Sequence, residues 1–266
     1  MREYIAVFDS GVGGLTVLKH LKEMMPKENY IFLADTLNMP YGDKNKEEIQ
    51  ELCLHNYEFL KEFNIKAVVI ACNTADSLAG DYLKTISDKK VFGVIKPAAL
   101  EAFKKTKNKR IGILATPATI NSLAYQKELL ELDAGLKVFN MPCFGLASLI
   151  ENHHYQEKDP EVEKALDKYL EPLIKEDIDT LILGCTHYPL LIDAIKKRHD
   201  ITIINSSMIE AENVYETLKE ENLLKDDEGK ILCYVSGDVL KFKQSIDLFM
   251  NNQDIEVYKK LSGFYF

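Results

Sequence analysis

Long apolar runs are missing from this chain of 266 residues, and so is a hydrophobic leader. No stretch approaches the ~18–20 consecutive apolar residues that a membrane-spanning helix needs. The chain begins with MREYIAVFDSG, which enters a strand-like segment without the charged start and apolar core of a signal peptide. We therefore expect a cytoplasmic protein without a membrane segment.

Paired cysteines and an excess of positive charge are also lacking. The five cysteines are an odd number, and none forms a CxxC pair, so a disulfide framework is a poor explanation and a reducing compartment fits better. The net charge of -9 argues against binding to nucleic acid or to an anionic membrane as the main role.

The pattern that is present is an alternation of short apolar runs with longer amphipathic ones, uninterrupted by low-complexity tracts. It predicts parallel sheets covered by helices on both faces, which is an α/β fold. Helices are expected at Lys46–Phe63 and Ile120–Leu132, and the charged residues 153–172 are expected to be a solvated loop that leads into an exposed helix. The predicted strands are Tyr4–Phe8, Tyr30–Ala34, Ala67–Ala71, Val91–Val94, Arg110–Leu114, Leu136–Asn140, Thr180–Leu183, Thr202–Asn205 and Ile231–Val235.

A weak internal repeat relates the two halves of this pattern. One strand ends at Asp9 in YIAVFDSGVGG, and a similar strand ends at Thr116 in RIGILATPATI, 107 residues later. Cys72 ends the apolar run of AVVIACNTADS, and Cys185 ends that of TLILGCTHYPL, 113 residues later. Ligands bind beyond the carboxyl ends of parallel strands, so two facing units would bring both thiols to one cleft.

A facing pair of thiols suits one kind of chemistry. Inverting the α-carbon of an amino acid needs a base on one face and an acid on the other. The reference pKa of cysteine, ~8.5, allows both roles, and a following helix N-terminus favours the thiolate. Asn73, Thr74 and Thr186 offer hydrogen-bond donors for a carboxylate. Taken singly, Cys72 and Cys185 could be small core residues, but their matching positions favour catalysis.

Five motifs occur in the order and spacing of the cofactor-independent glutamate racemases: FDSGVGGLTVL, LADTLNMPYG, VVIACNTA, IGILATPATI and LGCTHYPLL. The chain resembles this family from near Ile5 to Tyr234–Asp238. The resemblance implies two pseudo-symmetric α/β domains around a glutamate site, no cofactor, a homodimer, and a supply of D-glutamate for peptidoglycan. We expect residues 1–96 and 208–266 to form the first domain and residues 97–207 the second.

The resemblance also implies roles for individual residues. Cys72 serves one face of the substrate and is assisted by Asp9, whereas Cys185 serves the other and is assisted by His187. Glu151 occupies the position of an additional acidic helper. No metal is expected. The substrate-binding residues implied are Ser10, Pro40, Tyr41, Gly42, Asn73, Thr74, Thr116, Thr119 and Thr186.

The glycine loop DSGVGGLT supports a different interpretation, because a dinucleotide fingerprint also lies between a strand and a helix. Asp35, at the end of the next strand, stands where a ribose-binding acid could lie. However, Thr16 occupies the place of the third glycine after Gly11 and Gly13. An NAD site would also leave the paired cysteines unexplained.

The residues assigned to catalysis could also serve a structural, metal or cofactor site. Asp9 could cap the helix that follows it, and His187 could be an ordinary turn residue. Together with the two thiols these side chains could surround zinc, although Cys-x-His spacing is unusual for a structural zinc site. Lys96 is the lysine whose position most resembles that of a pyridoxal phosphate site, and it neither supports that cofactor nor weakens the thiol mechanism.

The substrate and the role are each open to a second interpretation. Aspartate is one methylene shorter than glutamate, and a pocket distinguishes the two by only about 1–3 kcal/mol. The chain could also be a non-catalytic protein that binds an amino acid or regulates a partner. Cys53, Cys143 and Cys233 are expected to be packing residues.

Overall fold

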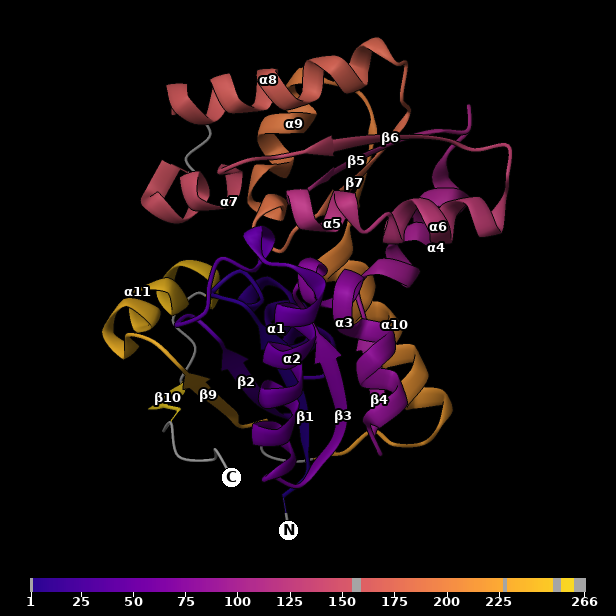
Figure 1. Cartoon of the computed structure of the whole chain (residues 1–266). Coiled ribbons are helices and arrows are strands. Elements are labelled where there is room, and N and C mark those ends of the chain that lie inside the picture. Colours follow the sequence, from indigo (N-terminus) through magenta and orange to yellow (C-terminus); the bar gives the residue numbers. More distant parts are fainter. Residues whose placement is uncertain (1, 155–158, 227–228, 251–254, 261–266) are drawn as a thin grey trace.

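The computed structural model describes residues 2–154, 159–226, 229–250 and 255–260. It contains two α/β domains, one above the other in Figure 1, each built on its own parallel sheet. This confirms the predicted fold class. In the part of the chain so described, no helix combines the length and the apolar character needed to cross a membrane.

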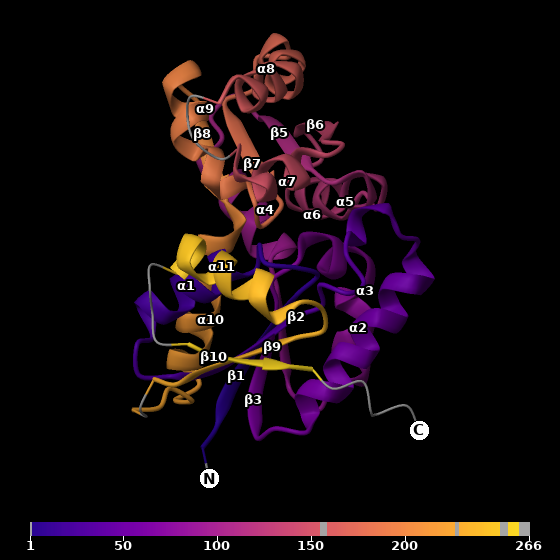
Figure 2. The same cartoon turned by 90° about the vertical axis from the view of Figure 1, so that its left-hand side faces the viewer.

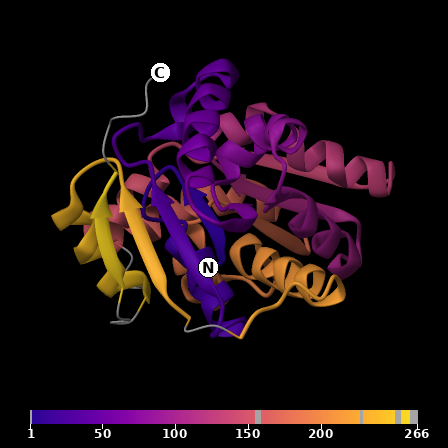
Figure 3. The same cartoon turned by 90° about the horizontal axis from the view of Figure 1, so that it is seen from below.

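The first sheet is covered by helices on both faces (Figure 3). In order across the sheet, its strands are β10 (Glu256–Lys259), β9 (Ile231–Val235), β2 (Asn29–Ala34), β1 (Tyr4–Asp9), β3 (Ile65–Ile70) and β4 (Lys90–Gly93). One face packs against α1 (Leu15–Met24), α10 (Ser206–Glu220) and α11 (Val239–Met250), and the other against α2 (Lys46–Lys61) and α3 (Asn73–Ile86). The central strands are continuous apolar runs because both faces are buried.

The second sheet follows the same plan on a smaller scale. Its strands, in order, are β6 (Lys137–Pro142), β5 (Arg110–Ala115), β7 (Thr180–Gly184) and β8 (Thr202–Asn205). One face packs against α4 (Ile95–Lys105) and α6 (Ala124–Leu132), and the other against α7 (Leu146–Leu149), α8 (Pro160–Lys175) and α9 (Ile192–Arg198).

The two sheets share a strand order, β2-β1-β3-β4 in the first and β6-β5-β7-β8 in the second. In each, the chain goes to one side of its first strand and then returns to the other, so the switch points lie between β1 and β3 and between β5 and β7. Ligand sites form beyond the carboxyl ends of strands at such points. Asp9 and Cys72 stand at the first switch point, and Thr116 and Cys185 stand at the second.

The chain crosses between the domains twice. It leaves the first sheet after β4 and enters α4, which packs against the second sheet, and it returns from β8 into α10, which packs against α1 (Figures 1 and 2). Helices α4 and α10 also contact each other. The C-terminal segment then adds β9 and β10 to the first sheet.

Some elements differ from the prediction. The single helix expected at Ile120–Leu132 is split into α5 (Pro117–Asn121) and α6, because Leu123 adopts a left-handed backbone with φ 57°. Strand β10 was not predicted, since it is short and carries the charged residues Glu256 and Lys259, which is typical of a sheet edge rather than of a buried strand. Helix α8 is not simply exposed: one side, which includes Leu166 and Leu170, is buried in the second domain. Residues 155–158 of the expected loop lie outside the described residues.

Candidate active site

A cavity of about 150 Å³ lies where the two domains meet, at the carboxyl ends of β1, β2, β3, β5, β6 and β7. Most of the site residues predicted from the sequence line it. They are Ser10, Pro40, Tyr41, Gly42, Cys72, Asn73, Thr74, Thr116, Glu151, Cys185, Thr186 and His187.

Two predicted residues, Asp9 and Thr119, are buried behind this wall. Asp9 Oδ2 accepts a hydrogen bond of 3.1 Å from the Gly11 amide, so the carboxyl group lies under the glycine loop. The Thr119 hydroxyl lies 2.9 Å from that of Thr116, which does line the cavity. Both residues can therefore act on the cavity through neighbours that face it.

Cys72 stands in the junction between β3 and α3, as the residue immediately before the helix. Its thiol donates to the Ser10 hydroxyl over 3.5 Å. Burial and the nearby charge of Asp9 raise the pKa of Cys72 to about 12, and the hydrogen bonds that the Ala75 amide and Ser10 would donate to the thiolate offset this only in part. The neutral thiol is therefore the favoured form of Cys72.

The carboxyl group of Asp9 is the charged group that raises the pKa of the Cys72 thiol. Burial raises the pKa of Asp9, while the positive charge of His187 and the amides of Gly11 and Gly14 act in the opposite direction. Its Oδ1 atom is buried without a hydrogen-bond partner among the described residues. Because leaving a buried carboxyl oxygen unpaired is costly, this arrangement is typical of a group that exchanges protons.

Cys185 has a different electrostatic environment. Its Sγ lies 3.7 Å from His187 Nδ1, and His187 Nε2 lies 2.7 Å from Oε1 of Glu151, in the π-helical turn η2 (Ile150–His154). Burial by itself would lower the pKa of His187, but hydrogen bonds to Cys185 and Glu151 and their charges outweigh it and raise this pKa to about 10. Cys185 therefore lies beside a cation.

The two junctions are alike in position but not in structure. An α-helix follows Cys72, whereas the one-turn 3-10 helix η3 (Tyr188–Leu191) follows Cys185. The sequence predicted a helix N-terminus at both thiols. At Cys185 the positive partner is the imidazole of His187 instead.

Three threonine hydroxyls form a cluster that joins the domains. Thr74, at the start of α3, lies 2.9 Å from the hydroxyl of Thr116 and 3.3 Å from that of Thr119. Thr116 also caps α5 by accepting a hydrogen bond from the Thr119 amide. Hydroxyl donors so grouped beside the cavity suit a carboxylate.

The glycine loop makes close contact with the second domain. A Cβ added to Gly13 would lie 2.3 Å from Thr186 Oγ1 and 2.5 Å from His187 Cε1, distances that real Cβ atoms do not show. Thr16, in the first turn of the following helix α1, donates to the Thr186 carbonyl over 3.1 Å. The turn therefore packs against Thr186 and His187 where the dinucleotide interpretation would require phosphates.

The sequence reasoning missed the contribution of the loop after β6. Cys143, predicted to be a packing residue, does pack in the second domain, but it also lines the cavity together with Phe144 and Gly145. A signal for this loop exists: Asn-Met-Pro occurs at residues 38–40, after β2, and again at residues 140–142, at the end of the equivalent strand β6.

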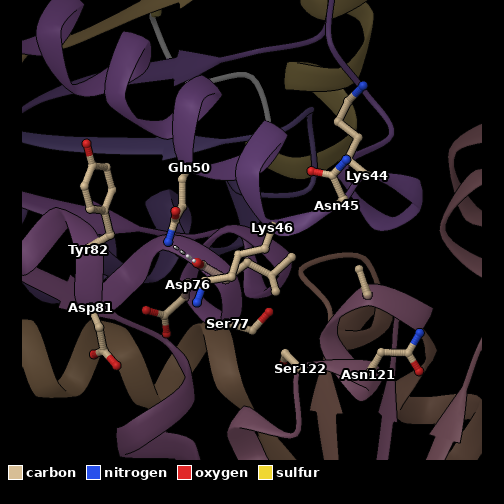
Figure 4. Close-up of a pocket in the computed structure, with 12 residues that line it drawn as sticks. Lys44, Asn45, Lys46, Gln50, Asp76, Ser77, Asp81, Tyr82, Asn121 and Ser122 are labelled. Carbon is tan, nitrogen blue, oxygen red and sulfur yellow. Dashed lines mark hydrogen bonds between the residues drawn. The ribbon is translucent and has the colours of Figure 1, made fainter.

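A larger cavity, of about 590 Å³, lies between α2, α3 and α5 (Figure 4). Its side chains include Lys46, Asp76 and Asp81, and Gln50 donates to the Leu78 carbonyl over 3.2 Å at its wall. No cysteine or histidine is among the residues that line it. A choice of site by cavity volume alone would therefore pick this cavity and not the one that the two thiols line.

The zinc interpretation requires a group of ligands in one place. Within residues 2–154, 159–226, 229–250 and 255–260, no three His, Cys, Asp or Glu side chains are grouped as a metal ion would need.

Comparison with known proteins gives a consistent result. The family model described as Asp/Glu/Hydantoin racemase matches residues 11–213. Glutamate racemase 1 of Caldanaerobacter subterraneus subsp. tengcongensis is 38% identical over 258 residues, which cover 96% of this chain and 95% of that protein. Among solved structures, glutamate racemase isoform RacE1 from Bacillus anthracis has a TM-score of 0.93 at 40% identity, over 98% of both chains.

Glutamate racemase from Francisella tularensis subsp. tularensis SCHU S4, solved in complex with D-glutamate, has a TM-score of 0.92 at 32% identity, over 99% of both chains. Its likeness, like those above, extends over both domains and both thiol-bearing junctions. The chain therefore belongs to the Asp/Glu/Hydantoin racemase family, within its glutamate racemases.

Proposed function

We propose that this enzyme interconverts L- and D-glutamate with two thiols, Cys72 and Cys185, one of which removes the α-proton as a thiolate while the other donates its own proton to the opposite face. The observation that carries the proposal is the single cavity that both thiols line, each beyond the equivalent strand of its domain. A planar carbanion has two faces, and inversion needs a base on one and an acid on the other. The relative solved with D-glutamate supports the choice of substrate.

We assign the proton of the resting enzyme to Cys72 and the thiolate to Cys185. The raised pKa of Cys72, about 12, favours its neutral form, and the imidazolium of His187 provides charge stabilisation for a thiolate at Cys185. One enantiomer is then deprotonated by Cys185 and reprotonated by Cys72. The other enantiomer requires the reverse protonation state, which Asp9 assists by accepting the thiol proton of Cys72.

Two side chains assist Cys185, one through the other. His187 assists Cys185, and Glu151 holds the imidazole in place and stabilises its charge. With no electron-sink cofactor in this mechanism, fixed donors in a small closed cavity must stabilise the carbanion. Donors for the substrate carboxylates come from Ser10, Asn73, Thr74, Thr116 and Thr186, Thr119 supports them through its contact with Thr116, and Pro40, Tyr41 and Gly42 complete the wall.

The same proposal divides the chain into residues 1–96 with 208–266 and residues 97–207. Its support is the packing of α4 on the second sheet and of α10 on the first, just beyond the two crossings. Because the substrate lies between the domains, we propose that they close around it by small movements at these crossings.

We further propose the setting in which the enzyme works. D-glutamate made here would supply peptidoglycan synthesis, the role of the family. Catalytic thiols must stay reduced, which fits the cytoplasm. A homodimer is proposed from the resemblance, and sedimentation equilibrium at catalytic concentrations tests it, since a monomeric mass would refute it.

The decisive experiment uses purified protein with L-glutamate in D2O. Loss of the α-proton is followed by NMR and loss of optical rotation by circular dichroism. We expect both, and we expect Cys72→Ala and Cys185→Ala each to abolish racemisation. Exchange with aspartate but not glutamate would move the proposal to the shorter substrate. Binding of glutamate without any exchange would favour a non-catalytic binding protein instead.

A further inference from the structure

Tyr125, in the first turn of α6, touches the two thiol-bearing junctions at once. It is 2% exposed. A Cβ added to Gly184 would lie 3.1 Å from Tyr125 Cε2, so the ring lies against the backbone just before Cys185. The hydroxyl of Tyr125 donates a hydrogen bond of 2.6 Å to Oδ1 of Asn73, the residue just after Cys72. One side chain of the second domain thus spans both halves of the site.

The contact with Asn73 determines which way its amide points. A side-chain amide has an acceptor end and a donor end, and the Tyr125 hydroxyl occupies the acceptor. The Nδ2 donor of Asn73 is buried and has no hydrogen-bond partner among the described residues. Asn73 lines the 150 Å³ cavity. A buried donor left unpaired beside a ligand cavity is costly unless a ligand acceptor satisfies it.

The Tyr125 hydroxyl keeps its proton at every pH at which the enzyme works. Burial raises the pKa of Tyr125, as does the nearby charge of Asp76, and a hydrogen bond from Ser206 opposes them. A permanent donor at this point fixes the amide in one orientation. If the tyrosine could ionise, it would accept from Asn73 and the opposite orientation would be favoured.

We propose that Tyr125 is a positioning residue for racemisation, which acts through Asn73 by holding the Nδ2 donor ready for a carboxylate oxygen of the amino-acid substrate. The proposal rests on the function proposed above. Its physical basis is that a preoriented donor loses no rotational freedom when the substrate binds. The ring also packs against Gly184, the residue just before Cys185.

The first test is Tyr125→Phe, which removes one oxygen and keeps the ring against Gly184. We expect KM for both L- and D-glutamate to rise by about five- to tenfold, the loss of one hydrogen bond, with kcat within about threefold. Tyr30→Phe is the matched control. Tyr30 is a buried tyrosine whose hydroxyl donates to the Leu21 and Met25 carbonyls, so this variant loses buried hydrogen bonds without approaching the cavity. An unchanged KM in Tyr125→Phe, or the same change in Tyr30→Phe, overturns the proposal.

The second test is a double-mutant cycle with Asn73→Ala. If Tyr125 acts through Asn73, adding Tyr125→Phe to Asn73→Ala raises KM by less than about twofold. A full additional increase would mean that Tyr125 acts elsewhere, and would refute the assignment. Calorimetric titration of the wild type, the two single variants and the double variant with D-glutamate gives the coupling as a difference in binding free energy. Wild-type racemisation is scored separately, so an inactive wild type counts against the proposed function and not against this coupling.

Discussion

Nε2 of His187 lies 2.7 Å from Oε1 of Glu151, and both atoms belong to side chains that are largely buried. This contact ties the imidazole beside Cys185 to a carboxylate from a separate turn of the second domain. Because the pKa of His187 is raised to about 10, the imidazole is positively charged over the neutral range. The charge beside Cys185 therefore depends on Glu151.

Glu151→Gln should lower the pKa of His187 by removing one of the two partners that raise it. As His187 loses its proton at alkaline pH, kcat/KM should decline. In Glu151→Gln we expect this alkaline limb of the pH profile to move to lower pH and the activity at neutral pH to fall by about tenfold. Initial rates measured in steps across the alkaline range would establish the shift. The control is Glu23→Gln, which breaks an exposed histidine–glutamate contact of 3.2 Å with His20. An alkaline limb at the wild-type pH would rule out this role for Glu151.

The three thiols that line the cavity should differ in their importance. Cys72→Ser and Cys185→Ser should each lower kcat by at least about 100-fold, since each removes a proton-transfer group. Cys143→Ala should stay within about threefold, because burial raises the pKa of Cys143 to about 12, its thiol donates to the Met141 carbonyl over 3.6 Å, and neither Asp9 nor His187 is among the groups that act on it. Rates from circular dichroism in both directions check this. A large loss in Cys143→Ala would require a third proton-transfer group.

Gly13→Ala should damage the site through a steric clash. The added methyl group would overlap Thr186 Oγ1 and the His187 ring, and relieving the overlap costs about 1–3 kcal/mol, which would lower kcat/KM by about 5- to 150-fold if the strain falls on the site. Gly11→Ala, in the same loop, is the matched control, since its Cβ would find ordinary contacts of 3.6 Å or more. Kinetics and thermal unfolding of both variants make the test, and equal losses would show that the loop has no special contact at Gly13.

The stability of the protein should fall as the pH rises from about 7 to 10. The folded pKa of His187, about 10, lies above the unfolded value of 6.5, so its contribution is fully present below 6.5 and lost as pH rises through 10. Cys72 acts in the same direction at higher pH, because its folded pKa is raised to about 12 from 9.0. Urea unfolding at several pH values should show the slope, and His187→Gln should flatten it. A stability that rises over this range would contradict the assignment.

Much of the fold was predictable because its physical causes are local. Strands buried on both faces must be apolar throughout, so β1, β3, β5 and β7 could be located from the sequence alone. The two thiols could be placed at one cleft because carboxyl ends of parallel strands meet at one edge. The break at Leu123 was not predictable, since a leucine gives no signal of a left-handed backbone.

Contacts between distant segments were the part that sequence could not supply. Tyr125 and Asn73 meet because two domains pack together, and nothing near either residue encodes that hydrogen bond. The same is true of Gly13: its motif indicates a tight turn but not that Thr186 fills the space above it. Cys143 was predictable only by noticing that Asn-Met-Pro occurs after β2 and again at the end of β6.

The charged neighbour of Cys72 is the carboxyl group of Asp9, which ends β1, whereas the neighbour of Cys185 is the imidazole of His187. The reaction links mirror-image molecules of equal free energy, so thermodynamics requires kcat/KM to be equal for L- and D-glutamate. It places no such requirement on kcat alone. An enzyme with a different partner behind each thiol is therefore free to turn over one enantiomer faster than the other, provided that it binds the faster one more weakly in the same proportion.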